Sequence, residues 1–467
     1  MKRVNVNSRM GSIRLIRTVL PVALIVCIGT VGLGAQQPND LSLQQAVRIA
    51  LEKSPVRKAA LADTKSAAAG VAAARAGLFP NLAFSETATR GNDPVYVFGS
   101  RLRQQRFAAS DFALNQLNTP APFGNFSTRF ASSWNLFDSF ASWRRIEQAK
   151  SAQEAASHQL ERSDQELVMR VIDSYYGVLL ARKRMQVAEQ ATQTAQSILD
   201  RSKARFESGL SVESDLLNAQ VRMSARQQEL IQARNDFAFS QAQLAVAMGL
   251  PPENSYEPAQ ALSEREWPVA SVTELEQAAV EHRPDLKQIQ SEESIQKLSV
   301  AIAKSSFGPR MNAFASWQAD NPTFVAGGGG NNWLGGIELQ VDLFTGGAKR
   351  AELARQKALA EKIAAMKQSA TDGVRLEVRR AYYDDDAARQ QVAVARAAVA
   401  QAQESLRISR NRYEAGLLTI TDLLSAEEAT LQTQLNYWNA VARSQTSYAN
   451  LELASGTLSV DSPVVLP

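Results

Sequence analysis

The stretch RFESGLSVESDLL, Arg205–Leu217, returns 207 positions later as RYEAGLLTITDLL, Arg412–Leu424. Seven of the thirteen positions are identical, and Phe206 and Tyr413 both carry an aromatic ring. Each copy stands within a long polar, alanine-rich segment. A motif duplicated over so long a distance indicates that the chain is built from two related halves.

Further correspondences flank the duplicated motif. LEKSPVRK from Leu51 matches VEHRPDLK from Val280 at an offset of 229, whereas Tyr175-Tyr176 matches Tyr382-Tyr383 at an offset of 207. The 22-residue difference lies within residues 80–137. Each half is therefore one unit, with a variable insert that we expect to be a loop on one face of the molecule.

The first 35 residues have the parts of a secretory signal peptide. A basic stretch precedes the apolar run VLPVALIVCIGTVGLGA, which is short for a membrane anchor. Cleavage is expected near Gly34 or Ala35. Cys27, the only cysteine, follows Val26 where a lipoprotein would carry a small residue, so we expect neither acylation nor a disulfide.

The charge balance argues against a nucleic-acid partner. Five of the 51 basic residues lie in the first 35 positions, which hold no acid, leaving 46 basic residues against 47 acidic ones in the rest of the chain. Binding to phosphate backbones depends on an excess of Lys and Arg. The basic character of the whole chain therefore belongs to its leader.

Two long spans are predicted to be helical. No proline occurs between Pro122 and Pro251 or between Pro322 and Pro463, and Ala, Gln, Glu, Arg and Leu dominate there. A helix from about Asp138 to Ser208 would have about 70 residues and a length of roughly 105 Å. A compact globular domain does not need a helix of that length.

Gly209 and Gly416 mark the ends of these helices. Each follows a turn rich in Arg or Lys, which suits a helix C-terminus with a left-handed glycine just beyond it. Both copies of the motif are therefore predicted to be tips of helical hairpins, with returning helices that run to about Gly249 and Gly456. Candidate caps of the returning helices are Ser211 or Ser214 and Thr419 or Thr421, followed by Asp215 and Asp422 in the first turn.

Alternating segments precede each long helix. From Phe126 and from Trp333, about ten residues alternate between apolar or aromatic and polar side chains, as in a strand of a transmembrane β-barrel. Less regular partners lie around Asn81–Thr89 and Asn312–Gln318. AGGGGNNW from Ala326 lies between two strands and is predicted to be an outer loop, not a phosphate-binding loop.

Four strands per chain cannot close a barrel. An open sheet edge in lipid exposes unpaired backbone groups that each cost several kcal/mol, and known barrels of this type have at least about eight strands. The chain is therefore expected to assemble from several copies. The strand count by itself permits two, three or four.

The two halves resemble the outer-membrane efflux protein family typified by TolC. The resemblance covers about residues 41–456 and rests on motifs that recur in order in both halves. These are Phe79-Pro80 or Gly308-Pro309 before the first strand, Leu136-Phe137 or Leu343-Phe344 after the second, and the two hairpin tips.

This resemblance implies a homotrimer in the outer membrane of a Gram-negative-type cell. Its fold would be mixed and mostly α, with four strands per chain in a 12-stranded β-barrel above a periplasmic α-barrel of coiled-coil hairpins. The channel would be a passive, gated conduit of a tripartite efflux or type I secretion system. Its partners would be outer-membrane lipid, a periplasmic adaptor (membrane fusion) protein and an inner-membrane pump that drives transport.

The resemblance also implies roles for the tip residues. In the family, residues at the turn glycine dock the adaptor, and rings of aspartate close the inner pore. The docking positions are Gly209, Leu210, Ser211, Gly416, Leu417 and Leu418, and the gate positions are Asp215, Asp422, Asn218 and Ser425. A third family aspartate is replaced by Ser425, with Asn218 in the corresponding place of the first half, so this gate would carry less charge.

Simpler roles for the same residues stay open at this stage. Asp215 and Asp422 could serve only as first-turn acids on a helix dipole, worth about 0.3–1 kcal/mol. The Gly-Leu pairs could be no more than a helix-terminating turn with its hydrophobic contact. Asp384-Asp385-Asp386 is expected to lie on a solvated helix face, although acids facing the lumen would favour cations.

No enzyme, cofactor or metal site is predicted. The only histidines, His158 and His282, lie far apart, and no Cys or clustered carboxylates accompany them at ligand spacing.

Two rival classes of protein remain. A secreted structural coiled coil would show continuous heptads and no alternating segments, and a stand-alone porin would have more strands and no long helices. The exported cargo is not specified.

The expected division of the chain follows from these elements. Its parts are a signal peptide (1–35), a first periplasmic helix (36–80), a β-hairpin with an outer loop (81–136), a long helical hairpin (137–250), a linker (251–270), a second helix (271–309), a second β-hairpin with an outer loop (310–344), a second helical hairpin (345–456) and a tail (457–467).

Overall fold

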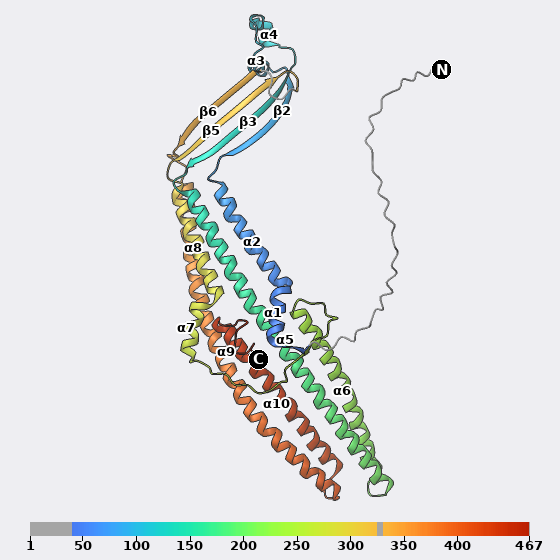
Figure 1. The fold of residues 1–467 in the computed structure, drawn as a ribbon. Helices are drawn as coiled ribbons and strands as arrows, with labels where there is room; N and C mark the ends of the chain where they lie inside the picture. The colour runs from blue at the N-terminus through green and yellow to red at the C-terminus, as the bar shows by residue number, and fades with distance from the viewer. Residues whose placement is uncertain (1–39, 325–329, 467) are drawn as a thin grey trace, which may run out of the picture. The chain divides into compact units, whose positions relative to one another are not determined.

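The computed structural model of the protein describes residues 40–324 and 330–466, and Asp40–Pro467 form one compact unit (Figure 1). The predicted signal peptide, Cys27 and part of the predicted 326–333 loop lie outside the described residues. In chain order, the elements are β1 (Asp40–Leu41), α1 (Leu43–Lys53), α2 (Pro55–Ala76), β2 (Asn81–Gly91), α3 (Pro94–Arg103), the 3₁₀ helix η1 (Ala109–Phe112), α4 (Leu114–Asn118), β3 (Phe123–Phe137), α5 (Ala141–Glu207), α6 (Glu213–Ala247), β4 (Glu257–Pro258), α7 (Val272–His282), α8 (Pro284–Ser305), β5 (Arg310–Asn321), β6 (Gly330–Gln340), α9 (Ala348–Glu414) and α10 (Ile420–Ser455).

Corresponding helices of the two halves have nearly equal lengths. Helices α1 and α7 have 11 residues each, α2 and α8 have 22, α5 and α9 have 67, and α6 and α10 have 35 and 36. The local starting signals also recur. Ser42 and Ser271 each form a capping box with the residue three positions on, and Pro55 and Pro284 each occupy the first position of a helix.

The four longer strands form an antiparallel sheet in the order β2-β3-β5-β6, at the end of the long helices away from the hairpin tips (Figure 1). Directly opposed residues Phe84, Phe130, Trp317 and Trp333 make an aromatic row across all four strands. The neighbouring row, on the opposite face, is Ser85, Arg129, Gln318 and Asn332. Because strand residues alternate between faces, one face of the sheet is mainly aromatic and the other mainly polar, with Phe314 and Leu334 as apolar exceptions on the polar face.

Two details of the sheet differ from expectation. The alternation from Trp333 runs on to Leu343, but β6 ends at Gln340, opposite Arg310. Pro309 precedes Arg310 and has no N–H to donate, so the ladder cannot continue. The insert between β2 and β3 is not an irregular loop throughout, because it contains α3, η1 and α4.

The largest hydrophobic core lies around the middle of α5. Val171, Ile172 and Tyr175 are fully buried there against α1 and parts of α6 and α10. The Tyr175 hydroxyl donates to the carbonyl of Leu41 at 3.0 Å, next to the two-residue parallel pairing of β1 with β4. Val465 of the tail packs into the same core. Among the described residues, no helix combines the length and apolarity needed to cross a membrane.

The acidic triplet in α9 is not a uniformly solvated face. Asp385 is 1% exposed, accepts a hydrogen bond from the Ser447 hydroxyl at 3.1 Å and lies 3.1 Å from the Arg389 guanidinium. Burial raises the pKa of Asp385, with Arg389 and Ser447 opposing that rise. The prediction of a solvated face was wrong for this residue because α10 covers it, a tertiary contact that helix periodicity does not reveal.

Candidate functional site at the helical hairpin tips

The two hairpin tips have nearly the same backbone. Gly209 and Gly416 have φ of 70° and 72°, so the prediction of left-handed glycines beyond the helix ends is confirmed. The N–H of Leu210 donates to the Arg205 carbonyl at 2.8 Å, and that of Leu417 donates to the Arg412 carbonyl at 2.9 Å. These bonds satisfy carbonyls that a helix end would otherwise leave without partners.

The returning helices begin differently in the two tips. Of the two predicted candidates, Thr419 caps α10, because its side chain accepts a hydrogen bond from the N–H of Asp422. At α6 the capping position is Val212, so the predicted caps Ser211 and Ser214 were wrong. Val212 stands where the second copy has Thr419, and its side chain can accept no hydrogen bond.

The predicted docking residues differ in accessibility. Leu210 and Leu417 are 69% and 72% exposed. Leu418 packs partly against the small cluster of Ile198, Tyr413 and Ile420. Gly209 and Gly416 are exposed, whereas Ser211 is half-buried and its hydroxyl has no hydrogen-bond partner in the described part of the chain. The structure therefore presents an exposed leucine on each tip, and the first tip adds Val212, which is 62% exposed.

The predicted gate residues lie in the first two turns of the returning helices, with Asp215 and Asp422 in the first turn and Asn218 and Ser425 in the second. The Asp422 carboxylate accepts a hydrogen bond from the Thr419 hydroxyl at 2.6 Å and is exposed. Asp215 is half-buried and makes no side-chain hydrogen bond or ion pair among the described residues. Asn218 and Ser425 are exposed, and the Ser425 hydroxyl donates to the Thr421 carbonyl at 2.8 Å. Asp422 therefore serves its helix locally, and Asp215 has no such partner.

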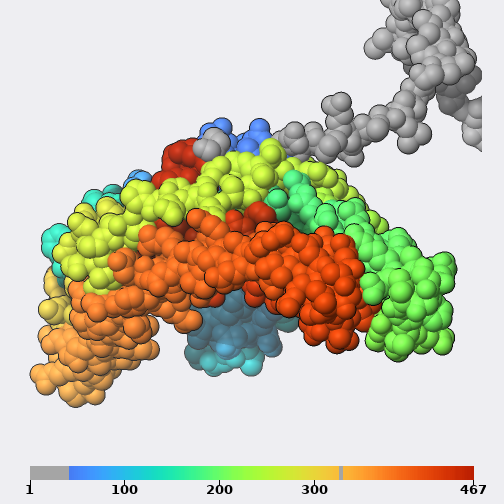
Figure 2. Space-filling view, turned by 90° about the horizontal axis from the view of Figure 1, so that it is seen from below, coloured from blue at the N-terminus to red at the C-terminus, as the bar shows by residue number. Residues whose placement is uncertain are grey.

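The two hairpins lie side by side, and contacts between them were not foreseen (Figure 2). The Arg205 guanidinium lies 5.3 Å from the centre of the Tyr413 ring and donates to the Tyr413 carbonyl at 3.4 Å. Arg201 pairs with Glu414. Tyr413 is 5% exposed, whereas its counterpart Phe206 is 38% exposed. The two tips thus have similar backbone conformations, but the aromatic residue is buried in the second tip and partly exposed in the first.

A second set of contacts lies farther from the tips. The buried guanidinium of Arg226 pairs with Glu428 on α10 and with Glu229 on its own helix, and Arg222 reaches Glu428 at 2.9 Å. A signal was available in the sequence, because the positions equivalent to Arg222, Arg226 and Glu428 in the other half are Ala429, Thr433 and Val221. Charges present in only one half are candidates for contacts between the halves.

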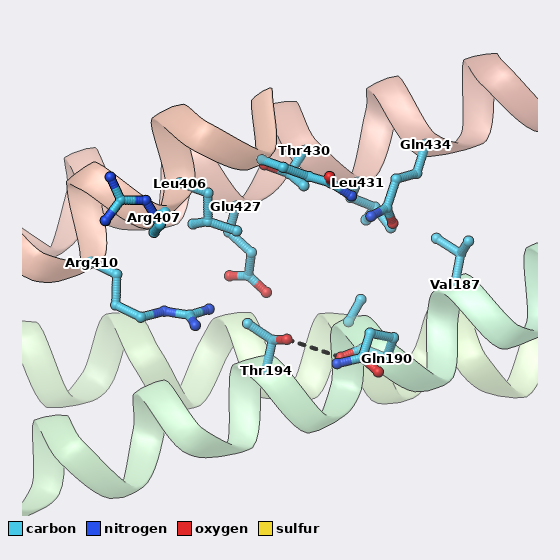
Figure 3. A pocket seen from close by; sticks show the side chains of 12 residues that line it. Val187, Gln190, Thr194, Leu406, Arg407, Arg410, Glu427, Thr430, Leu431 and Gln434 are labelled. Atoms are coloured by element: carbon cyan, nitrogen blue, oxygen red, sulfur yellow. Dashed lines mark hydrogen bonds between the residues drawn. The ribbon is translucent and has the colours of Figure 1, made fainter. Parts of the chain in front are cut away.

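Glu427 lines a pocket of about 250 Å³ between α5 and the second hairpin (Figure 3). Its carboxylate is 3% exposed, and neither oxygen has a hydrogen-bond partner among the described residues. Burial raises the pKa of Glu427, opposed by the charges of Arg226 and Arg222. Arg410 and Thr194 line the same space. No group of three or more His, Cys, Asp or Glu suited to a metal ion occurs in residues 40–324 and 330–466.

Long helical hairpins lead into a sheet with one aromatic and one polar face, which is the alternation that strands of an outer-membrane β-barrel show. The profile of the outer membrane efflux protein family matches residues 46–250 and 275–457, so the chain belongs to that family. The sequence resemblance is thereby confirmed. The family consists of transport components rather than enzymes.

Curated relatives and solved structures agree with this assignment. The chain is 24% identical over 432 residues to the alkaline protease secretion protein AprF of Pseudomonas aeruginosa, covering 90% of this chain and 85% of AprF. It is 25% identical over 336 residues to the outer membrane protein TolC of Vibrio cholerae, covering 68% and 74% of the two chains. The CmeC outer membrane channel of Campylobacter jejuni has the same fold, with a TM-score of 0.76 at 17% identity over 90% of this chain and 87% of that one. The protein is an outer-membrane channel of the efflux and secretion type.

Proposed function

We propose that three copies of the chain form one passive, gated conduit from the periplasm to the exterior. The observation that carries this proposal is the four-stranded sheet, in which β2 and β6 are edge strands with one partner each among the described strands. Three sheets joined through β6 of one copy and β2 of the next would close a 12-stranded barrel and satisfy both edges. The aromatic face would then contact lipid, and the polar face would line the lumen.

The hairpin tips are proposed to form the periplasmic end of the conduit. Leu210 and Leu417 would dock a periplasmic adaptor protein, because exposed leucines on rigid turns offer apolar anchors that gain stability when a partner covers them. The adaptor would connect the channel to an inner-membrane pump that supplies the energy. The positions Gly209, Ser211, Gly416 and Leu418 would shape the same surface.

Asp215 and Asp422 are proposed to gate the inner end, with Asn218 and Ser425 completing the ring. Carboxylates from three copies brought together around a narrow pore would repel anions and attract cations. Asp215 is the stronger candidate, because its carboxylate makes no side-chain hydrogen bond or ion pair among the described residues, whereas that of Asp422 is bonded to Thr419.

Single-channel recording in planar bilayers tests these proposals together. Native mass spectrometry should first establish a trimer, and the wild type should show a small conductance that rises markedly in an Asp215→Ala/Asp422→Ala variant. The matched control is Ser425→Ala, which changes a neutral gate position and should have little effect. A trimer whose conductance does not change would leave the conduit in place and return both aspartates to helix stabilisation. A protein that neither inserts nor conducts would contradict the conduit itself.

A further inference from the structure

The segment between β2 and β3, residues 92–122, folds onto the polar face of the sheet. At Gly330, whose missing side chain would lie on that face, a Cβ would overlap the carbonyl oxygen of Arg103. The side-chain amide of Asn332, on the same face, donates to that carbonyl at 3.5 Å. Helix α3 packs against β3, β5 and β6. The segment therefore lies across the sheet at its end away from the helices.

A buried chain of polar side chains fixes this arrangement. The Gln104 amide donates to the Asn125 side chain at 2.7 Å and to the Gly124 carbonyl at 3.0 Å, and the Asn125 amide donates to Asp320 at 2.6 Å. Gln104, Asn125 and Asp320 are 4%, 6% and 0% exposed. The side-chain oxygen of Gln104 has no hydrogen-bond partner in the described part of the chain, but the bonds from its amide link the segment to the sheet. Breaking them would leave further buried polar groups unpaired, which is costly, so they hold the segment in place.

Some charged side chains of the segment have hydrogen-bond or ion-pair partners, and others have none among the described residues. Residues 92–122 hold three arginines and two aspartates. Asp93 caps α3, and Asp111 pairs with Arg101. Arg103 and Arg106 are exposed and have no ion-pair partner among the described residues, and the same holds for Arg129 on the polar face. The three arginines and two aspartates give the segment a net charge of +1, and two of its exposed arginines have no ion-pair partner in the part of the chain that the structure describes.

We propose that residues 92–122 form an inward-folded outer constriction of the channel, in which Arg103 and Arg106 favour passage of anionic solutes. The inference rests on the proposed function, because the polar face lines a lumen only if the sheets of several copies close a barrel. Positive side chains that line a pore raise the local concentration of anions and oppose cations. Cargo that carries carboxylate or phosphate groups would leave this mouth most readily.

Ion selectivity in planar bilayers provides the first test, with the Asp215→Ala/Asp422→Ala protein as background so that the inner end does not dominate. Arg103→Gln should raise the ratio of cation to anion permeability by about twofold or more, as expected for a charge on a pore wall. Arg90→Gln is the matched control, because Arg90 lies on the other face at the same end of the sheet. No shift with Arg103→Gln, or an equal shift with both variants, would overturn the inference.

Cysteine labelling tests the inward fold directly, since Cys27 in the predicted signal peptide is the only natural cysteine. A bulky, negatively charged thiol reagent applied from the outer side should reduce the current of an Arg103→Cys protein by roughly half, because it occupies a narrow pore. It should leave an Arg90→Cys protein unchanged at equal labelling. Full labelling at position 103 without loss of current would overturn the inference, whereas a protein that forms no channels would overturn the proposed function as well.

Discussion

Arg226 offers the sharpest test of how the two hairpins are held together. Its guanidinium is 1% exposed and bonds to Glu229 on α6 and to Glu428 on α10. Burial by itself would lower the pKa of Arg226, but the hydrogen bonds and charges of the two glutamates outweigh burial and raise it. Arg226 therefore stays charged, and the contact is a buried cation held by two half-exposed carboxylates.

Replacing Arg226 by Met keeps most of the apolar stem and removes the charge. Two charge-assisted hydrogen bonds worth about 1.5–3 kcal/mol each are lost. The loss is reduced because the glutamates are 50% and 47% exposed and regain water, and because Arg222 still reaches Glu428 at 2.9 Å. The loss of stability is reduced further because Met, unlike Arg, does not bury a charged group. We expect the hairpin contact to weaken by about 1–2 kcal/mol, or roughly 5- to 30-fold in its local opening equilibrium.

Hydrogen–deuterium exchange of the assembled protein measures that opening. Peptides of α6 around residue 226 and of α10 around residue 428 should exchange roughly 5- to 30-fold faster in Arg226→Met, as follows from the free energy above. Arg222→Met is the control, because Arg222 is 28% exposed and its loss should cost less than about 1 kcal/mol. Exchange in Arg226→Met that matches the wild type, or equal effects of the two variants, would refute the reasoning.

Three further outcomes are expected. Burial raises the pKa of Glu452 to about 7 from 4.5, so Glu452 loses its proton at a lower pH in the unfolded chain than in the folded protein, and the free energy of unfolding should fall as the pH rises from about 4.5 to about 7. Thermal unfolding of Glu452→Gln should depend less on pH over this window, and an unchanged pH dependence would contradict the assignment. Gly416→Ala should speed hydrogen–deuterium exchange at the second tip by an amount equivalent to about 1 kcal/mol, because a residue with a side chain is strained at φ of 72° even where there is space for the side chain. An unchanged exchange rate would show that the tip backbone adapts. Ser271→Ala should lower the stability measured by thermal unfolding by about 1 kcal/mol, because it removes the capping box with Glu274. The control Ser211→Ala loses no hydrogen bond and should be close to neutral. Equal losses of stability in the two variants would argue against a capping effect.

The hairpin tips show which structural features could be predicted from local sequence patterns. The left-handed glycines at 209 and 416, the long helices and the cap at Thr419 were all predictable, because each depends on interactions within a few residues. The same reasoning chose the wrong caps at the first tip, where Ser211 and Ser214 flank an apolar Val212. A cap depends on backbone register, and composition near a turn does not determine register to within one residue.

The amino-acid sequence by itself determined the helices, the alternating strands and the paired tips, because helix periodicity, strand alternation and capping act over short distances along the chain. Only the tertiary structure decided which faces meet. It buried Asp385 under α10, joined Arg226 to Glu428 and laid residues 92–122 on the polar side of the sheet. These contacts link residues 62, 202 and 21 positions apart. No local preference specifies them, because their stability depends on how whole elements pack together.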